Sequence, residues 1–176
     1  MKCGLCKSGH RVVAGVGPKD AKMFLVGEAP GKKEDEAGMP FVGRSGRFLD
    51  SMLVNAGVSR GEVFITNIVR CRPPNNRKPT KKEMEACLPL LMEEIESVGP
   101  KVIVTLGASP LIALTGYIGR LADVVGEEQP AEFGGITIPV IPCYHPSAAM
   151  RNRELRMKFA KALSQAISAA NGACGR

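Results

Sequence analysis

The fold is decided by one stretch near the start of the chain, Lys22-Met23-Phe24-Leu25-Val26-Gly27-Glu28-Ala29-Pro30-Gly31. Its first half is a short apolar run that stops at a glycine, as a buried strand of a parallel sheet does. Its second half is a turn whose glycines let backbone N–H groups approach a ligand closely. A helix is expected next, because apolar residues recur at helical spacing before the capping Gly57: Phe48, Leu49, Met52, Leu53 and Ala56.

The same order of elements repeats along the chain. Apolar runs at residues 62–66, 101–106 and 134–141 predict three more strands. Helices are expected from the capping box at residues 80–83 to about Val98, from residue 107, and over residues 151–170. Strands that alternate with helices predict an α/β fold with a parallel sheet covered on both faces. A length of 176 residues fits one domain, residues 1–176.

Composition and charge narrow the class of protein. Charges interrupt the hydrophobic residues, so no apolar run approaches the roughly 20 residues that span a bilayer. The N-terminus carries no apolar segment of signal-peptide length, and we therefore expect an intracellular, cytoplasmic protein. The net charge of +7 favours a polyanionic partner or simple solubility without choosing between them. Basic residues crowd residues 70–82 and 151–161, which fits either phosphate binding or two solvated faces.

Polar residues follow three of the predicted strands. Because parallel strands end at one edge of a sheet, we expect Glu28, Asn67 and His145 at the same crevice. The amide of Asn67 offers a donor beside an acceptor, which matches O4 and N3–H of uracil, although asparagines after strands are often turn formers. His145, restricted by Pro146, can stabilise an anionic leaving group or be purely structural.

Two loop features are open to more than one interpretation. Phe41 lies in a Gly- and Pro-rich stretch, where its ring can stack on a base or fill the core. The turn at residues 27–31 is no Walker loop, because no Gly-Lys-Ser/Thr follows, and it lacks the dinucleotide fingerprint. An ordinary connection between strand and helix remains the alternative.

The six cysteines favour metal ligands or buried thiols over disulfides in an intracellular chain. Cys3 and Cys6 form a CxxC pair, and Cys71 and Cys87 lie on either side of the basic loop. Four thiolates bind zinc or an iron–sulfur cluster, and the spacing does not separate these two or exclude four separate thiols. The other two, Cys143 and Cys174, stand alone, and we expect a buried and a tail thiol.

These blocks, in this order, resemble the family 4 uracil-DNA glycosylases, the iron–sulfur branch of the uracil-DNA glycosylase superfamily. The resemblance covers nearly the whole chain, through Cys3-x-x-Cys6, residues 26–31, 40–46 and 66–77, Cys87 and His145-Pro146-Ser147. It implies a three-layer α/β/α domain with a four-stranded parallel central sheet. It also implies a structural [4Fe–4S] cluster on Cys3, Cys6, Cys71 and Cys87.

The resemblance assigns roles at the crevice as well. It implies that Glu28 activates water, at a place where other branches of the superfamily use Asp, and that His145 donates to O2 of uracil. The implied base-binding residues are Ala29, Gly31, Glu34, Phe41, Asn67 and His145. Among them Phe41 stacks on the flipped base, Asn67 reads its pairing edge and Glu34 lies near C5. The residues expected to contact DNA are Arg72, Arg77, Ser147, Met150 and Arg151.

The expected activity is that of a monofunctional glycosylase, because no lysine is evident at the crevice to form a Schiff base. Such an enzyme flips uracil out of double- or single-stranded DNA and hydrolyses its N-glycosidic bond, leaving an abasic site for base excision repair. The alternatives are a glycosylase for hypoxanthine or xanthine, and a non-catalytic iron–sulfur or zinc protein that binds single-stranded nucleic acid. We expect a monomer without a membrane partner, since no heptad pattern is evident.

Overall fold

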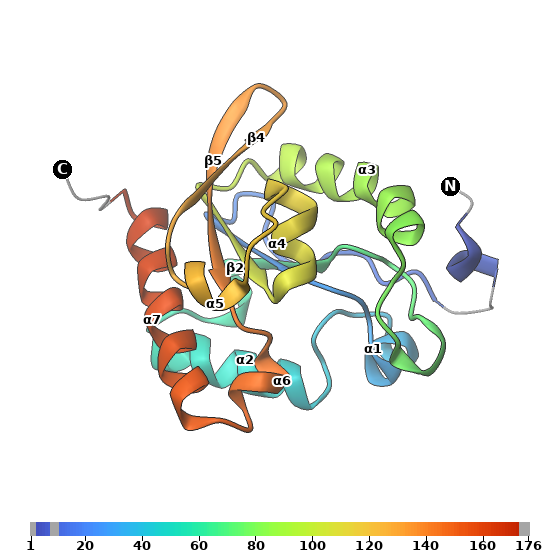
Figure 1. The fold of residues 1–176 in the computed structure, drawn as a ribbon, viewed down its shortest axis with the longest axis horizontal. Coiled ribbons are helices and arrows are strands. Elements are labelled where there is room, and N and C mark those ends of the chain that lie inside the picture. The colour runs from blue at the N-terminus through green and yellow to red at the C-terminus, as the bar shows by residue number, and fades with distance from the viewer. Residues whose placement is uncertain (1–2, 8–10, 173–176) are drawn as a thin grey trace.

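The structure is a computed structural model that describes residues 3–7 and 11–172. Its centre is one sheet with the strand order β2-β1-β3-β5-β4. Four strands run parallel, namely β1 (Met23–Gly27), β2 (Val63–Asn67), β3 (Val102–Leu106) and β5 (Ile136–Cys143). Helices cover both faces of this sheet, so the expected three-layer α/β/α architecture is confirmed (Figure 1).

The expected four parallel strands are confirmed, and β4 (Gln129–Phe133) adds a fifth, unpredicted strand at the edge of the sheet. β4 pairs antiparallel with β5, to which the glycines at 134 and 135 join it, both with positive φ (56° and 82°). A two-residue turn with positive φ at both positions has a backbone twist that matches the right-handed twist of the two strands of a hairpin. The sequence does not predict β4 because only Ala131 and Phe133 of this strand are buried, whereas Glu132 is exposed and Pro130 interrupts the apolar run.

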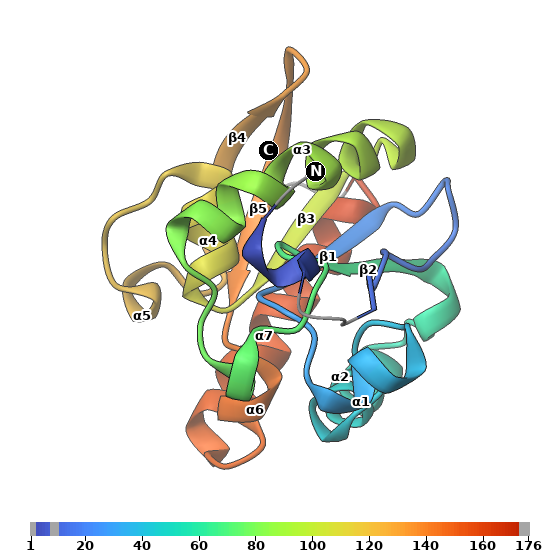
Figure 2. The same ribbon diagram turned by 90° about the vertical axis from the view of Figure 1, so that its right-hand side faces the viewer.

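Each face of the sheet has its own hydrophobic core. One face packs against α2 (Arg44–Asn55), α6 (Pro146–Ala149) and α7 (Arg153–Ala170). The other packs against α3 (Lys81–Val98) and α4 (Ala108–Thr115). The 3-10 helix η1 (Gly4–Lys7) joins the second core through Leu5 and lies in front of the sheet in Figure 2. Alternate residues of the parallel strands therefore face different helices, which explains why β1, β2 and β3 are buried along their whole length.

The predicted helix boundaries are close to the observed ones. Thr80 and Glu83 form the expected capping box of α3, and Gly99 ends that helix in the left-handed region (φ 59°). α7 begins two residues later than expected, after Asn152, whose side chain accepts from Leu155 N. Three short helices were not predicted, namely α1 (Lys32–Ala37), α5 (Leu121–Val124) and α6. No helix in the described part of the chain is both long and apolar enough to cross a membrane.

The strand register fixes where the polar residues gather. Gly27 is the partner of Asn67, and Leu106 is the partner of Cys143. The parallel strands therefore end almost level with one another, and the segments that follow them meet at one edge. This is the edge at which ligands bind in open α/β sheets.

Candidate functional site

A cavity of about 650 Å³ opens at the carboxyl edge of the sheet. It brings together most of the residues predicted from the sequence: Glu28, Ala29, Gly31, Glu34, Phe41, Asn67, Arg77, His145, Ser147 and Arg151. Arg72 and Met150 lie outside this lining, each next to it: Arg72 Nε donates to Oδ1 of the lining residue Asn76 (2.7 Å), and Met150 directly precedes Arg151. The geometry thus unites segments that are more than 100 residues apart in the sequence.

Asn67 ends β2 with its side chain buried at 2% exposure. Its Oδ1 has no hydrogen-bond partner among the residues that the structure describes. A buried acceptor without a partner costs about 1–3 kcal/mol, which a donating ligand restores. The lack of a side chain at Gly27 makes space for the Asn67 amide, because a Cβ at Gly27 would lie 2.4 Å from Asn67 Oδ1 and 2.6 Å from the ring of Phe41.

Phe41 combines a buried ring with a strained backbone. Its side chain is 6% exposed and lines the cavity, with its ring centroid 6.1 Å from that of His145. Its φ is +53°, in the left-handed region that residues other than glycine adopt rarely. Non-glycine residues in such conformations concentrate at functional sites, where the surrounding structure holds them in place.

Glu34 ties two loops of the cavity together. Its Oε1 accepts from Val42 N (3.0 Å) and Gly43 N (2.7 Å), and its Oε2 accepts from Gly31 N (3.2 Å). Both carboxylate oxygens are thereby engaged by backbone amides of the cavity wall. The short helix α1, which sequence reasoning missed, is what carries this side chain to the loop after β1 and to the loop around Phe41.

Glu28 follows β1 and receives a hydrogen bond from the Oγ of Ser109, at the start of α4. Sequence reasoning did not select Ser109, although the signal was present. A helix opening at residue 107, directly after the third strand, brings its first turn to the same edge as Glu28. Asn76 was missed as well, and it lines the cavity from the loop after β2 with φ at +54°.

His145 precedes α6 and is held by Ser147. Its Nδ1 accepts from Ser147 N (3.2 Å) and lies 2.7 Å from Ser147 Oγ. Burial lowers the pKa of His145 below its ordinary value, while the charges of Glu28 and Glu34 oppose that shift. The ring is therefore neutral at pH 7, and because Nδ1 accepts from a backbone amide, its proton is on Nε2.

Three predicted cluster ligands converge in the core that lies against α3. Cys3, Cys71 and Cys87 come from three separate segments, are all buried, and belong to the same apolar cluster. Cys6 lies in η1, but its side chain is outside the described part of the structure. Among the described side chains, no group of three or more His, Cys, Asp or Glu is arranged to hold a metal ion. Three buried cysteine sulfurs in one cluster nevertheless fit the chemistry of a four-cysteine site.

Cys143 stands apart from that cluster. Cys143 ends β5 on the opposite face of the sheet, in the core formed with α7. Burial raises the pKa of this thiol far above its ordinary value, so it stays protonated. Cys174 falls outside the described residues.

The basic loop after β2 divides into a buried and an exposed part. Arg70 is only 2% exposed, and its guanidinium pairs with Glu94 of α3 at 2.8 Å, so it is not part of a phosphate-binding surface. Arg77 lies at the cavity and forms two hydrogen bonds to Glu83, at 2.7 and 2.9 Å. The hydrogen bond with Arg77 lowers the pKa of Glu83 to about 2.

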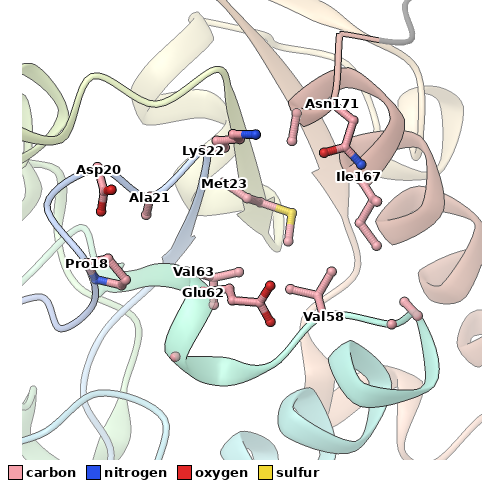
Figure 3. A pocket seen from close by; sticks show the side chains of 14 residues that line it. Pro18, Asp20, Ala21, Lys22, Met23, Val58, Glu62, Val63, Ile167 and Asn171 are labelled. Atoms are coloured by element: carbon pink, nitrogen blue, oxygen red, sulfur yellow. The ribbon is translucent and has the colours of Figure 1, made fainter.

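A second cavity, of about 450 Å³, lies at the amino end of β1 and β2 (Figure 3). Its lining includes Lys22, Val58, Glu62 and Ile167. None of the residues predicted for catalysis, base binding or DNA contact lines it. The cavity at the carboxyl edge is therefore the candidate functional site.

Comparison with known proteins shows the family to which this chain belongs. A sequence model described as "Uracil DNA glycosylase superfamily" matches residues 14–169. A "Type-4 uracil-DNA glycosylase" of Pyrobaculum aerophilum is 44% identical over 93% of this chain and 85% of its own. Proteins of the same description from Archaeoglobus fulgidus and Thermotoga maritima are each 40% identical, over 90% and 89% of this chain and 81% and 80% of their own. The chain therefore belongs to the uracil-DNA glycosylase superfamily, in its type-4 branch.

Proposed function

We propose that this protein is a uracil-DNA glycosylase that removes uracil from DNA as a step of DNA repair. The observation that carries the proposal is the buried Oδ1 of Asn67, which lacks a partner among the described residues and lies beside the ring of Phe41. An acceptor and a neighbouring amide donor, next to an aromatic ring, form the complement of a flipped uracil. The names of the relatives support the same substrate.

Base recognition follows from these two side chains. N3–H of uracil donates to Asn67 Oδ1, and Asn67 Nδ2 donates to O4. Cytosine presents the reverse pattern, an acceptor at N3 and a donor at N4, and so leaves both amide groups unpaired. Stacking on Phe41 adds about 1–3 kcal/mol, while Ala29 and Gly31 close the wall beside the base.

Bond cleavage uses the polar groups around the base. As the N-glycosidic bond breaks, positive charge develops on the sugar and negative charge on the departing uracil. The Nε2–H of His145 donates to O2, and Asn67 donates to O4, so both stabilise the leaving anion. Glu28, held by Ser109, orients a water whose hydroxyl adds to C1′ of the sugar and whose other proton neutralises the released uracil.

The expectation that no lysine lies at the crevice was wrong, because Lys32 and Lys33 line the cavity. Both side chains are largely exposed and lie beside Glu36, at 3.9 and 3.0 Å, so we propose that neither forms a Schiff base. The product is then an abasic site, without a covalent enzyme intermediate.

DNA binding engages the rim of the same cavity. Arg77, Ser147 and Arg151 line it, and Arg72 and Met150 lie next to it, so these residues contact the phosphates and the gap left by the flipped nucleotide. The enzyme acts as a monomer on double- and single-stranded DNA. Mispaired uracil is flipped more readily than paired uracil, because less pairing energy opposes its extrusion.

A [4Fe–4S] cluster completes the proposal, held by Cys3, Cys6, Cys71 and Cys87. Its contribution would be structural, since these four thiolates would cross-link the N-terminal segment, the loop after β2 and α3. The support is the burial of Cys3, Cys71 and Cys87 in one apolar cluster. The reaction itself is carried out by side chains at the cavity, namely Glu28, Asn67 and His145.

The decisive experiment incubates anaerobically purified protein with a uracil-containing oligonucleotide. The matched thymine, hypoxanthine and xanthine oligonucleotides are controls, and each sample is treated with alkali before electrophoresis. Cleavage of the uracil strand alone, and only after alkali, is the expected result. Release of hypoxanthine or xanthine instead, or binding without release of any base, contradicts the proposal. A visible spectrum of the same sample tests the cluster, which predicts a brown protein.

A further inference from the structure

The side chain of Arg60 contacts the backbone of the Phe41 loop. It lies in η2 (Arg60–Glu62), the 3-10 helix that leads into β2. Its Nη2 donates to the carbonyl oxygen of Pro40 at 2.5 Å, and its Nη1 donates to that of Phe41 at 3.0 Å. Nη1 also pairs with Asp50 Oδ1 of α2 at 2.8 Å. One guanidinium thus connects η2, α2 and two consecutive carbonyls of the loop.

The backbone of this loop requires such support. The φ of +53° at Phe41 is unfavourable for a residue with a Cβ, so the local sequence alone does not maintain it. The carbonyl also packs tightly on α2, because a Cβ at Gly46 would lie 1.7 Å from Phe41 O. On the opposite side of the loop, Glu34 accepts from the amides of Val42 and Gly43.

The loop is therefore held from both sides, by Arg60 through its carbonyls and by Glu34 through its amides. Glu34 lines the cavity, whereas Arg60 does not, and the Arg60 side chain is only about one-third exposed. Its guanidinium is already engaged by two carbonyls and one carboxylate. Arg60 thus acts on the base through Phe41 and not by touching the base.

We propose that Arg60 is a positioning residue, which fixes the strained backbone of Phe41 so that the ring is ready to stack on the flipped uracil. The inference rests on the proposed function and extends it, because it assigns the rigidity of the stacking ring to a residue outside the cavity. A preorganised ring loses less freedom on binding, so removing the support weakens the bound and transition states together.

The test is a double-mutant cycle of Arg60→Ala with Phe41→Ala, measured as single-turnover release of uracil. We expect Arg60→Ala to reduce kcat/KM about tenfold, within the range that one stacked base contributes. In the Phe41→Ala background the same change should cost less than about twofold, because the two residues act as one unit. Arg60→Lys, which retains a donor for the carbonyls, should recover part of the loss. Arg120→Ala is the matched control, since it removes an exposed arginine paired with Asp123 at 2.8 Å.

Equal losses in both backgrounds would overturn the inference and assign Arg60 to general stability or to phosphate attraction. Hydrogen exchange provides a readout that does not depend on catalysis. In Arg60→Ala, the amides of residues 41–46 should exchange faster while those of the central strands stay protected. If the wild-type protein releases no uracil, the proposed function fails, and this exchange measurement still tests whether Arg60 holds the loop. Unchanged exchange there would contradict the inference separately.

Discussion

The substitution Asn67→Asp tests the base-reading site most directly, because it replaces the only amide donor that faces O4 in the proposed complex. Removing one donor to a developing anion costs about 2.7–4 kcal/mol in comparable sites. Setting an acceptor against O4 in place of the donor adds about 1–3 kcal/mol for the unpaired buried group. At 1.36 kcal/mol per factor of ten, the rate of uracil release should fall about 10³-fold or more at pH 8.

The pH dependence of that loss follows from the surroundings. The new carboxyl would be buried at a position only 2% exposed and would share the cavity with Glu28 and Glu34. Burial and like charges both favour its protonated form, and a protonated carboxyl can again donate to O4. The deficit relative to wild type should therefore shrink as the pH falls from 8 to 5, and slow release of cytosine becomes possible.

The assay is single-turnover release from uracil and cytosine oligonucleotides, with thermal melting of each protein as a check of folding. Asn55→Asp is the matched control, because it makes the same change at an exposed position at the end of α2. Uracil release within about fivefold of wild type at pH 8 would refute the role of Asn67 in reading the base, since even one lost hydrogen bond of this kind exceeds that.

Three further predictions concern the other groups. His145→Ala should lower the rate of uracil release about 10²-fold or more, and a normal rate with only a lower Tm would make His145 structural. Because the folded pKa of His145 is below that of the unfolded chain, the unfolded chain binds its proton first as the pH falls, so stability is complete above about pH 6.5 and declines below it. His145→Ala should flatten this decline in urea unfolding between pH 7.5 and 5.5, and an unchanged slope would contradict the assignment. Cys71→Ser should lose visible absorbance and stability together, whereas a brown and equally stable variant would exclude Cys71 as a ligand.

The parallel sheet and the residues that gather at its carboxyl edge were predictable, because both depend on local sequence patterns. Apolar runs that end in Gly27 or Asn67 predict strands, and parallel topology then brings their ends together. β4 was not predictable, because an edge strand with one buried face and a proline has no continuous apolar run. The contact of Ser109 with Glu28 and that of Arg60 with Phe41 were not predictable either. They join residues 81 and 19 positions apart through side-chain geometry that no local pattern encodes. Arg70 was misread because charge alone does not distinguish an exposed arginine from one buried against Glu94.

The segment from Thr66 to Arg77 explains why base reading and the cysteine cluster occur in one small domain. Asn67, which we propose reads the base, ends β2, and four residues later Cys71 is buried in the core that packs against α3. Between them, Arg70 is fixed by Glu94 of α3 and by the hydroxyl of Thr66, one residue before Asn67. Removing Glu94 would be costly, because it would leave the charge of the buried Arg70 uncompensated. The chain after Asn67 is therefore anchored at Arg70 and at Cys71 before it continues to Arg77 at the cavity, so the two cavity residues Asn67 and Arg77 are held by the same anchors.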